Sequence, residues 1–261
     1  MNRIFLREDE TDIYLKSKNV FKIGVIGISS ESGTSFIATS LAKELSKDKK
    51  KRIAYIEINN GENTKLLYDS LGMDKRFAGR KFFDFYNAIG EGLNIGEQIN
   101  LDEKINWVLR MPPYYMQKQN KTKLNTMQLC RLINHVCGDI IICDITWDES
   151  TEEILKEMDY VVAVIDPMPS KLIFGYERLC MLKKNDLREG KTLWVVNKYN
   201  DGINKREFND FVKLKKEITV PWIENELFYN SEYNCKIPYS TQRIYNKLKQ
   251  PVNDMIYRLG L

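Results

Sequence analysis

The chain has 261 residues, of which 43% are hydrophobic and 29% are charged, and its formal net charge is +4. This length suits one large domain with a sizeable core, and the charge is too small to indicate nucleic-acid binding by itself. No apolar run approaches the roughly 20 residues that span a bilayer, and the start of the chain lacks the apolar core of a signal peptide. Five cysteines without C-x-x-C spacing are typical of reduced thiols, so we expect a cytoplasmic protein.

The order of the predicted elements indicates the fold class. We expect residues 1–20 to be a polar leader and residues 21–261 to form a single domain. Strands are predicted at residues 22–28, 52–58, 81–86, 105–110, 139–144, 160–165, 192–196 and 218–222. Helices are predicted at residues 34–46, 63–72, 124–136, 151–158, 170–184, 205–214 and 241–259, with a polar loop at 114–123. This alternation predicts a three-layer α/β fold, with a mostly parallel central sheet and helices on both faces.

The first strand leads through a turn of small, polar residues into the first helix. A phosphate-binding loop of the form G-x-x-x-x-G-K-[ST] occupies this place in P-loop NTPases. Gly33 and Ser35 match its second glycine and its hydroxyl residue. Thr34 replaces the lysine, and Ile28 replaces the first glycine, with Gly27 one residue earlier. The turn therefore has the layout of a phosphate cradle without its cation.

Two interpretations of this turn remain open. Any doubly wound fold has such a turn, and Glu31 places a negative charge beside it. Backbone N–H groups at a helix N-terminus nevertheless bind anions without a lysine, and Ser35 is a candidate magnesium ligand. The candidate phosphate-binding residues are Ser32, Gly33, Thr34, Ser35 and Phe36.

Asp144 ends a predicted buried strand, where it either caps a turn or orders magnesium and its water. Parallel strands end at the same edge of a sheet, so Asp144 and Ser35 should line one crevice and form the candidate metal site. His135 is the only histidine, which excludes a Ser-His-Asp triad and a multi-histidine metal site. We interpret it as a packing residue on its helix.

Taken together, these segments resemble the MinD/ParA branch of P-loop NTPases. Residues 22–35 match a deviant Walker A motif, residues 52–59 the D-x-D segment and residues 139–146 Walker B. Residues 192–198 are similar to the strand that ends in a base-contacting asparagine, here Asn197, and residues 160–170 to a strand followed by a proline-containing turn. The resemblance implies ATP or ADP with Mg²⁺ as cofactors.

The chain departs from this family at the positions used for hydrolysis. Ser29 and Thr34 stand where the family has its two lysines, and Glu57 and Asn59 replace the aspartates of D-x-D. An asparagine cannot accept a proton at neutral pH, and each lost charge-stabilising group lowers the rate by a factor of about 100 to 1,000. We therefore assign no catalytic residue and expect a pseudo-ATPase.

The leading hypothesis is a scaffold or localisation protein that forms a homodimer and acts through protein partners. Within the branch it resembles the TadZ/CpaE-like proteins, which implies a role with the Tad (Flp) pilus secretion machinery. A second hypothesis is a weakly active ParA-type ATPase that contacts DNA through residues 47–52 and 213–216. A third is a membrane-surface switch that uses the apolar stripe of residues 241–259. DNA and membrane are the less favoured partners.

Overall fold

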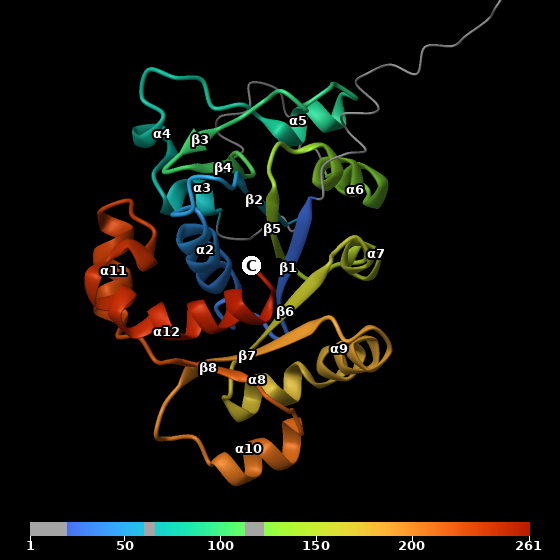
Figure 1. The fold of residues 1–261 in the computed structure, drawn as a ribbon, viewed down its shortest axis with the longest axis vertical. Helices are drawn as coiled ribbons and strands as arrows, with labels where there is room; N and C mark the ends of the chain where they lie inside the picture. Colours follow the sequence, from blue (N-terminus) through green and yellow to red (C-terminus); the bar gives the residue numbers. More distant parts are fainter. Residues whose placement is uncertain (1–19, 60–65, 113–122) are drawn as a thin grey trace, which may run out of the picture.

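A computed structural model describes residues 20–59, 66–112 and 123–261 (Figure 1). In these ranges the chain forms one eight-stranded sheet with the order β3-β4-β2-β5-β1-β6-β7-β8. The strands are β1 (Phe21–Gly27), β2 (Ile53–Ile58), β3 (Leu101–Asp102), β4 (Ile105–Val108), β5 (Ile140–Ile145), β6 (Tyr160–Ile165), β7 (Thr192–Tyr199) and β8 (Ile218–Pro221). Only the pairing of β3 with β4 is antiparallel.

Helices cover both faces of this sheet. They are α2 (Thr34–Leu45), α3 (Leu67–Ser70), α4 (Met73–Arg76), α5 (Phe85–Gly90), α6 (Thr126–His135), α7 (Thr151–Lys156), α8 (Pro169–Phe174), α9 (Tyr176–Glu189), α10 (Lys205–Val212), α11 (Asn225–Tyr233) and α12 (Gln242–Arg258). Helices α2, α11 and α12 pack on one face, and α6, α7 and α9 pack on the other (Figure 1). The predicted three-layer α/β class is confirmed.

The central strands are apolar because both of their faces are buried. Every residue of β2 and β5 is buried, and so are the last five residues of β1. Strand β1 lies between β5 and β6, with Val25 paired to Asp144 on one side and to Val162 on the other. Because these strands are parallel, their carboxyl ends meet at one edge of the sheet, where the turn after β1 begins.

The predicted strand at residues 81–86 is wrong. Asp84 instead caps α5, because its carboxylate accepts a hydrogen bond from the backbone N–H of Asn87. The predicted helix at 63–72 falls partly outside the described residues. From residue 66 on, the chain forms two short helices, α3 and α4, on either side of Gly72. The predicted loop at 114–123 also lies outside the described residues, except for its last residue.

The helix predicted at residues 170–184 is interrupted at Gly175, between α8 and α9. A Cβ atom on Gly175 would lie 2.6 Å from the carbonyl oxygen of Ile28, so the glycine allows this point of the chain to approach the turn after β1.

Helix α11 and the short strand β3 were not predicted. His135 is exposed at the end of α6, where its ring bonds the carbonyl of Arg131, so the packing interpretation of this residue is wrong.

The apolar stripe of the last helix faces the protein's own core. Ile244, Leu248, Val252 and Met255 of α12 are fully or almost fully buried, and α12 contacts β8 and α2. The helix also continues through Pro251. This conformation leaves the stripe unavailable to a membrane surface. Among the described residues, no helix has both the length and the apolar character needed to cross a membrane.

Candidate functional site

The candidate site begins where β1 ends and the chain turns into α2. Gly33 is the N-cap of α2, with φ at 91° in the left-handed region, and no side chain caps the helix. A Cβ atom on Gly33 would lie 2.1 Å from the Asn197 amide nitrogen, so both backbone conformation and space require glycine here. The backbone N–H groups of the first turn lack intrahelical partners, which makes this terminus suitable for an anion.

Ser35 and Asp144 meet at this edge of the sheet, as the sequence predicts. Ser35 is exposed in the first turn of α2, and Asp144 is buried near the end of β5. Burial raises the pKa of Asp144, and interactions with the hydroxyls of Ser35 and Tyr55 oppose that rise. The Tyr55 hydroxyl donates to Asp144 Oδ2 at 2.8 Å.

Sequence reasoning missed Tyr55, although it precedes Glu57 by two residues and therefore shares its face of β2. It is fully buried, and burial raises its pKa well above the ordinary value. The sequence signal for Tyr55 was a tyrosine in a strand whose other residues, apart from Glu57, are aliphatic. Its hydroxyl needs a buried partner, and the carboxylate on the neighbouring strand provides it.

Glu57 and Asn59 lie at the end of β2 and are buried. The Glu57 carboxylate accepts hydrogen bonds from the backbone N–H groups of Leu67 at 3.1 Å and Arg110 at 3.2 Å. Burial raises the pKa of Glu57 to about 7, and the neighbouring Asp144 adds to the rise. Glu57 therefore connects, through hydrogen bonds, the segment that follows β2 and the segment that follows β4.

The remaining predicted residues of the turn have different surroundings. The hydroxyls of Ser32 and Thr34 lie 3.2 Å apart, and a Cβ atom added at Gly27 would lie 2.0 Å from the first and 2.7 Å from the second. The ring of Phe36 packs edge-on against Phe228, with 5.0 Å between the ring centroids, so its side chain belongs to the core.

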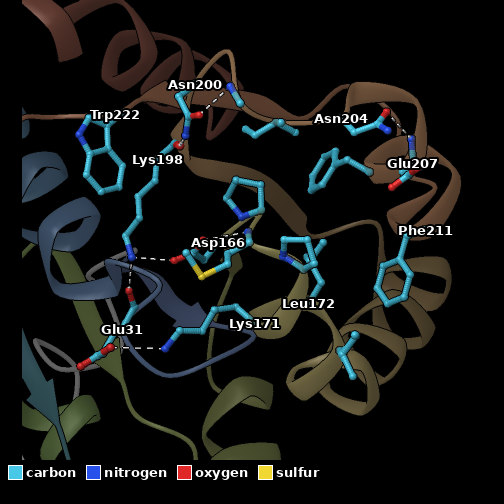
Figure 2. A pocket seen from close by; sticks show the side chains of 17 residues that line it. Glu31, Asp166, Lys171, Leu172, Lys198, Asn200, Asn204, Glu207, Phe211 and Trp222 are labelled. Atoms are coloured by element: carbon cyan, nitrogen blue, oxygen red, sulfur yellow. Dashed lines mark hydrogen bonds and ion pairs between the residues drawn. The ribbon is translucent and has the colours of Figure 1, made fainter.

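Three side chains from other elements donate hydrogen bonds to backbone carbonyls of the turn. Asn197 Nδ2 donates to the carbonyl of Ser32 at 2.8 Å. Lys198 Nζ donates to the carbonyl of Glu31 at 2.7 Å and to Asp166 Oδ2 at 2.6 Å (Figure 2). The sequence predicted a role for Asn197 alone. The signal for Lys198 was its place directly after Asn197 at the end of a strand.

Lys171 of α8 is the third of these side chains. Its Nζ donates to the carbonyl of Ser30 at 3.1 Å and lies 3.4 Å from the Glu31 carboxylate. The negative charge of Glu31 is therefore paired with a lysine rather than left beside the turn. No local sequence pattern marks Lys171, since it reaches the turn only through the packing of α8.

A cavity of about 720 Å³ lies behind the two lysines, between α8, α10 and the segment after β7 (Figure 2). Its walls include Leu172, Phe208, Phe211 and Trp222, and its polar end is formed by Lys171, Lys198, Glu31 and Asp166.

The residues present fit a magnesium-bound phosphate ligand. Mg²⁺ prefers oxygen ligands and is usually held by one or two protein groups together with phosphate oxygens, and Ser35 and Asp144 supply two such groups. No cluster of three or more His, Cys, Asp or Glu side chains suited to a metal occurs among the described residues, so phosphate oxygens would complete the shell. The buried Ser29 hydroxyl has no hydrogen-bond partner within the described structure and remains free for a ligand.

The sequence matches no model of a known protein family, and no curated protein matches it. Solved structures do match the fold. A ParA family ATPase from Chlorobium tepidum TLS aligns over 90% of this chain and 98% of its own, with 15% identity and a TM-score of 0.69. The septum site-determining protein MinD from Pyrococcus horikoshii OT3, complexed with Mg-ADP, covers 90% of this chain and 96% of its own at 12% identity, with a TM-score of 0.68.

A variant of McdA from Cyanothece, in complex with ATP, covers 94% of this chain and 98% of its own. Its identity is 11% and its TM-score 0.63. At these identities the likeness concerns the fold. It extends over almost the whole of each chain, and the described residues show the same parallel sheet with helices on both faces. This chain therefore has the fold of the ParA and MinD ATPases.

Proposed function

We propose that this protein binds ATP or ADP with Mg²⁺ at the turn between β1 and α2, and that it hydrolyses ATP slowly or not at all. The proposal depends on one observation. The exposed Ser35 hydroxyl, at the uncapped N-terminus of α2, faces the buried Asp144 carboxylate at the end of β5. Phosphate-binding turns of P-loop NTPases pair these two chemical groups around magnesium.

Each predicted residue has a role in this proposal. The backbone amides of residues 32–36 surround the phosphates, and the Ser35 hydroxyl and Asp144 hold the magnesium ion and its water. Asn197 Nδ2 already donates to the turn, so its amide oxygen is the group we assign to the base. Fold neighbours that contain Mg-ADP or ATP support a nucleotide as the ligand.

Slow hydrolysis follows from the side chains around the phosphates. Neither Ser29 nor Thr34 carries a positive charge that could stabilise the negative charge of the transition state. Asn59 cannot accept a proton from water. At about 100- to 1,000-fold for each lost group, the combined reduction leaves little catalysis. Binding requires only the amides, the hydroxyl and the carboxylate, and these are present.

The test measures binding and turnover on the same sample. Isothermal titration with ADP and ATP, with and without Mg²⁺, should show binding that Mg²⁺ strengthens, while phosphate release stays near the buffer blank. Ser35→Ala should weaken the Mg²⁺-dependent part of binding, and Ser70→Ala, a change in α3, provides the control. Rapid turnover would refute the pseudo-ATPase proposal, and absence of binding would refute the nucleotide site.

We further propose that the nucleotide-bound protein is a cytoplasmic homodimer that acts as a scaffold for protein partners, with the Tad pilus machinery as the leading candidate. Support comes from large apolar side chains that remain exposed on and next to α8. Met168 is 56% exposed, Ile173 71% and Phe174 67%. Exposed apolar groups gathered in one place are typical of protein interfaces. Sedimentation with and without ATP tests the dimer. If the proposal holds, adding ATP doubles the mass of the sedimenting species.

A further inference from the structure

Three consecutive carbonyl oxygens of the turn accept hydrogen bonds from side chains of other elements. Lys171 Nζ donates to Ser30 O at 3.1 Å, Lys198 Nζ to Glu31 O at 2.7 Å and Asn197 Nδ2 to Ser32 O at 2.8 Å. We call Lys171, Asn197 and Lys198 the turn clamp. Its members come from α8 and from the end of β7, far from the turn in sequence.

The clamp determines where the amides of the turn point. The peptide bonds of the described chain are trans, and in a trans peptide the C=O of one residue and the N–H of the next point in opposite directions. Holding the carbonyls of Ser30 and Glu31 on the cavity side therefore directs the N–H groups of Glu31 and Ser32 away from the cavity. Adjacent amides oriented in this way form an anion-binding concavity.

The lysines of the clamp also balance two acidic groups beside the turn. Lys198 lies 2.6 Å from Asp166, whose side chain is 6% exposed, and Lys171 lies 3.4 Å from Glu31, whose side chain is 84% exposed. Without the lysines, these two carboxylates would lie beside the turn without this counter-charge, and their negative charge would make phosphate binding there less favourable. Thr34 has no charge with which to compensate.

We propose that Lys171 and Lys198 are positioning residues of the phosphate site. They replace the missing lysine of the turn by fixing its amides toward the ligand and by neutralising Asp166 and Glu31. The site then selects an anionic diphosphate or triphosphate although the turn itself has no cation. This inference rests on the proposed nucleotide binding and adds the groups that organise it.

Binding to the full chain tests the proposal. Lys198→Met and Lys171→Met keep much of each side chain but remove its charge and its donor. Losing a hydrogen bond from a charged group lowers an equilibrium constant about 10- to 100-fold. We therefore expect each variant to bind ADP and inorganic pyrophosphate about 10- to 100-fold more weakly. Lys198→Arg and Lys171→Arg should recover most of the affinity. Lys156→Met, which breaks the exposed pair with Glu153 on α7, should bind as the unmodified chain does.

A double variant separates positioning from charge. Lys198→Met with Asp166→Asn removes the uncompensated carboxylate but does not restore the bond to Glu31 O. We expect binding to remain weak, and full recovery would overturn the positioning role. Without ligand, backbone amide exchange of residues 30–33 should be faster in both Met variants than in Lys156→Met. Unchanged exchange would also overturn it.

The two levels of the proposal fail differently. If the unmodified chain binds ADP and both Met variants bind it equally well, the clamp is refuted while nucleotide binding stands. If the unmodified chain binds neither ADP nor pyrophosphate, nucleotide binding is refuted, and the role of the clamp in it falls as well.

Discussion

Glu57→Gln should change how the stability of the protein depends on pH. In the folded state the pKa of Glu57 is about 7, compared with an ordinary value of 4.5, mainly because the carboxylate is buried. As the pH rises from 4.5 to 7, the unfolded chain ionises first, so the folded state holds more protons. The contribution of Glu57 to stability is therefore fully present below pH 4.5 and is lost as the pH rises through the folded pKa.

The size of this effect follows from the shift. The rise of the pKa from 4.5 to about 7 corresponds to about 3 kcal/mol of unfolding free energy above pH 8, and most of it is lost between pH 5 and pH 8. Glutamine cannot ionise, so Glu57→Gln lacks this loss. The glutamine side chain has one acceptor oxygen instead of two, so the variant loses the hydrogen bond from the backbone N–H of Leu67 or of Arg110. This loss lowers its stability by about 1–3 kcal/mol at every pH.

Urea unfolding of both proteins from pH 5 to pH 8, without nucleotide or Mg²⁺, provides the assay. The difference in unfolding free energy should move in favour of Glu57→Gln by about 2–3 kcal/mol across this range and level off near pH 8. Asp144 titrates in both proteins, so the comparison largely isolates Glu57. A difference that stays constant over the whole range would show that Glu57 is not desolvated as the structure indicates.

Three further substitutions test separate contacts. Tyr55→Phe removes the donor to Asp144 but keeps the ring beside Trp107, and denaturant unfolding should show a loss of about 1.5–3 kcal/mol; unchanged stability would contradict a hydrogen bond there. Gly33→Ala forces a Cβ against Asn197 and should weaken ADP binding in titration, whereas Gly79→Ala, at a φ of 78° with no atom within 4 Å, shares only the backbone strain. Equal ADP binding by these two variants would argue against the close approach. Leu248→Ala should lower stability by about 2–5 kcal/mol in thermal unfolding, because α12 packs on the core, and Tyr257→Ala at an exposed site should change it by less than about 0.5 kcal/mol. If Leu248→Ala were equally mild, α12 would not be docked as described.

The sequence by itself determined the central strands, the helices between most of them and the pairing of Ser35 with Asp144. Continuous apolar runs such as β5 have few alternatives to a buried parallel strand, and parallel strands bring their ends to one edge. It failed at residues 81–86, because the aromatic residues of this run favour a strand, whereas the cap at Asp84 starts helix α5 at Phe85.

Only the tertiary structure decided which side chains surround the turn. Lys171 and Lys198 reach it because α8 follows β6, the strand next to β1, and β7 lies on the other side of β6. Tyr55 reaches Asp144 because β2 lies next to β5. These contacts join residues between 89 and 167 positions apart, so no local pattern could reveal them. A sequence motif reports the backbone conformation of its own segment, whereas the charges and donors around that segment depend on how distant elements pack.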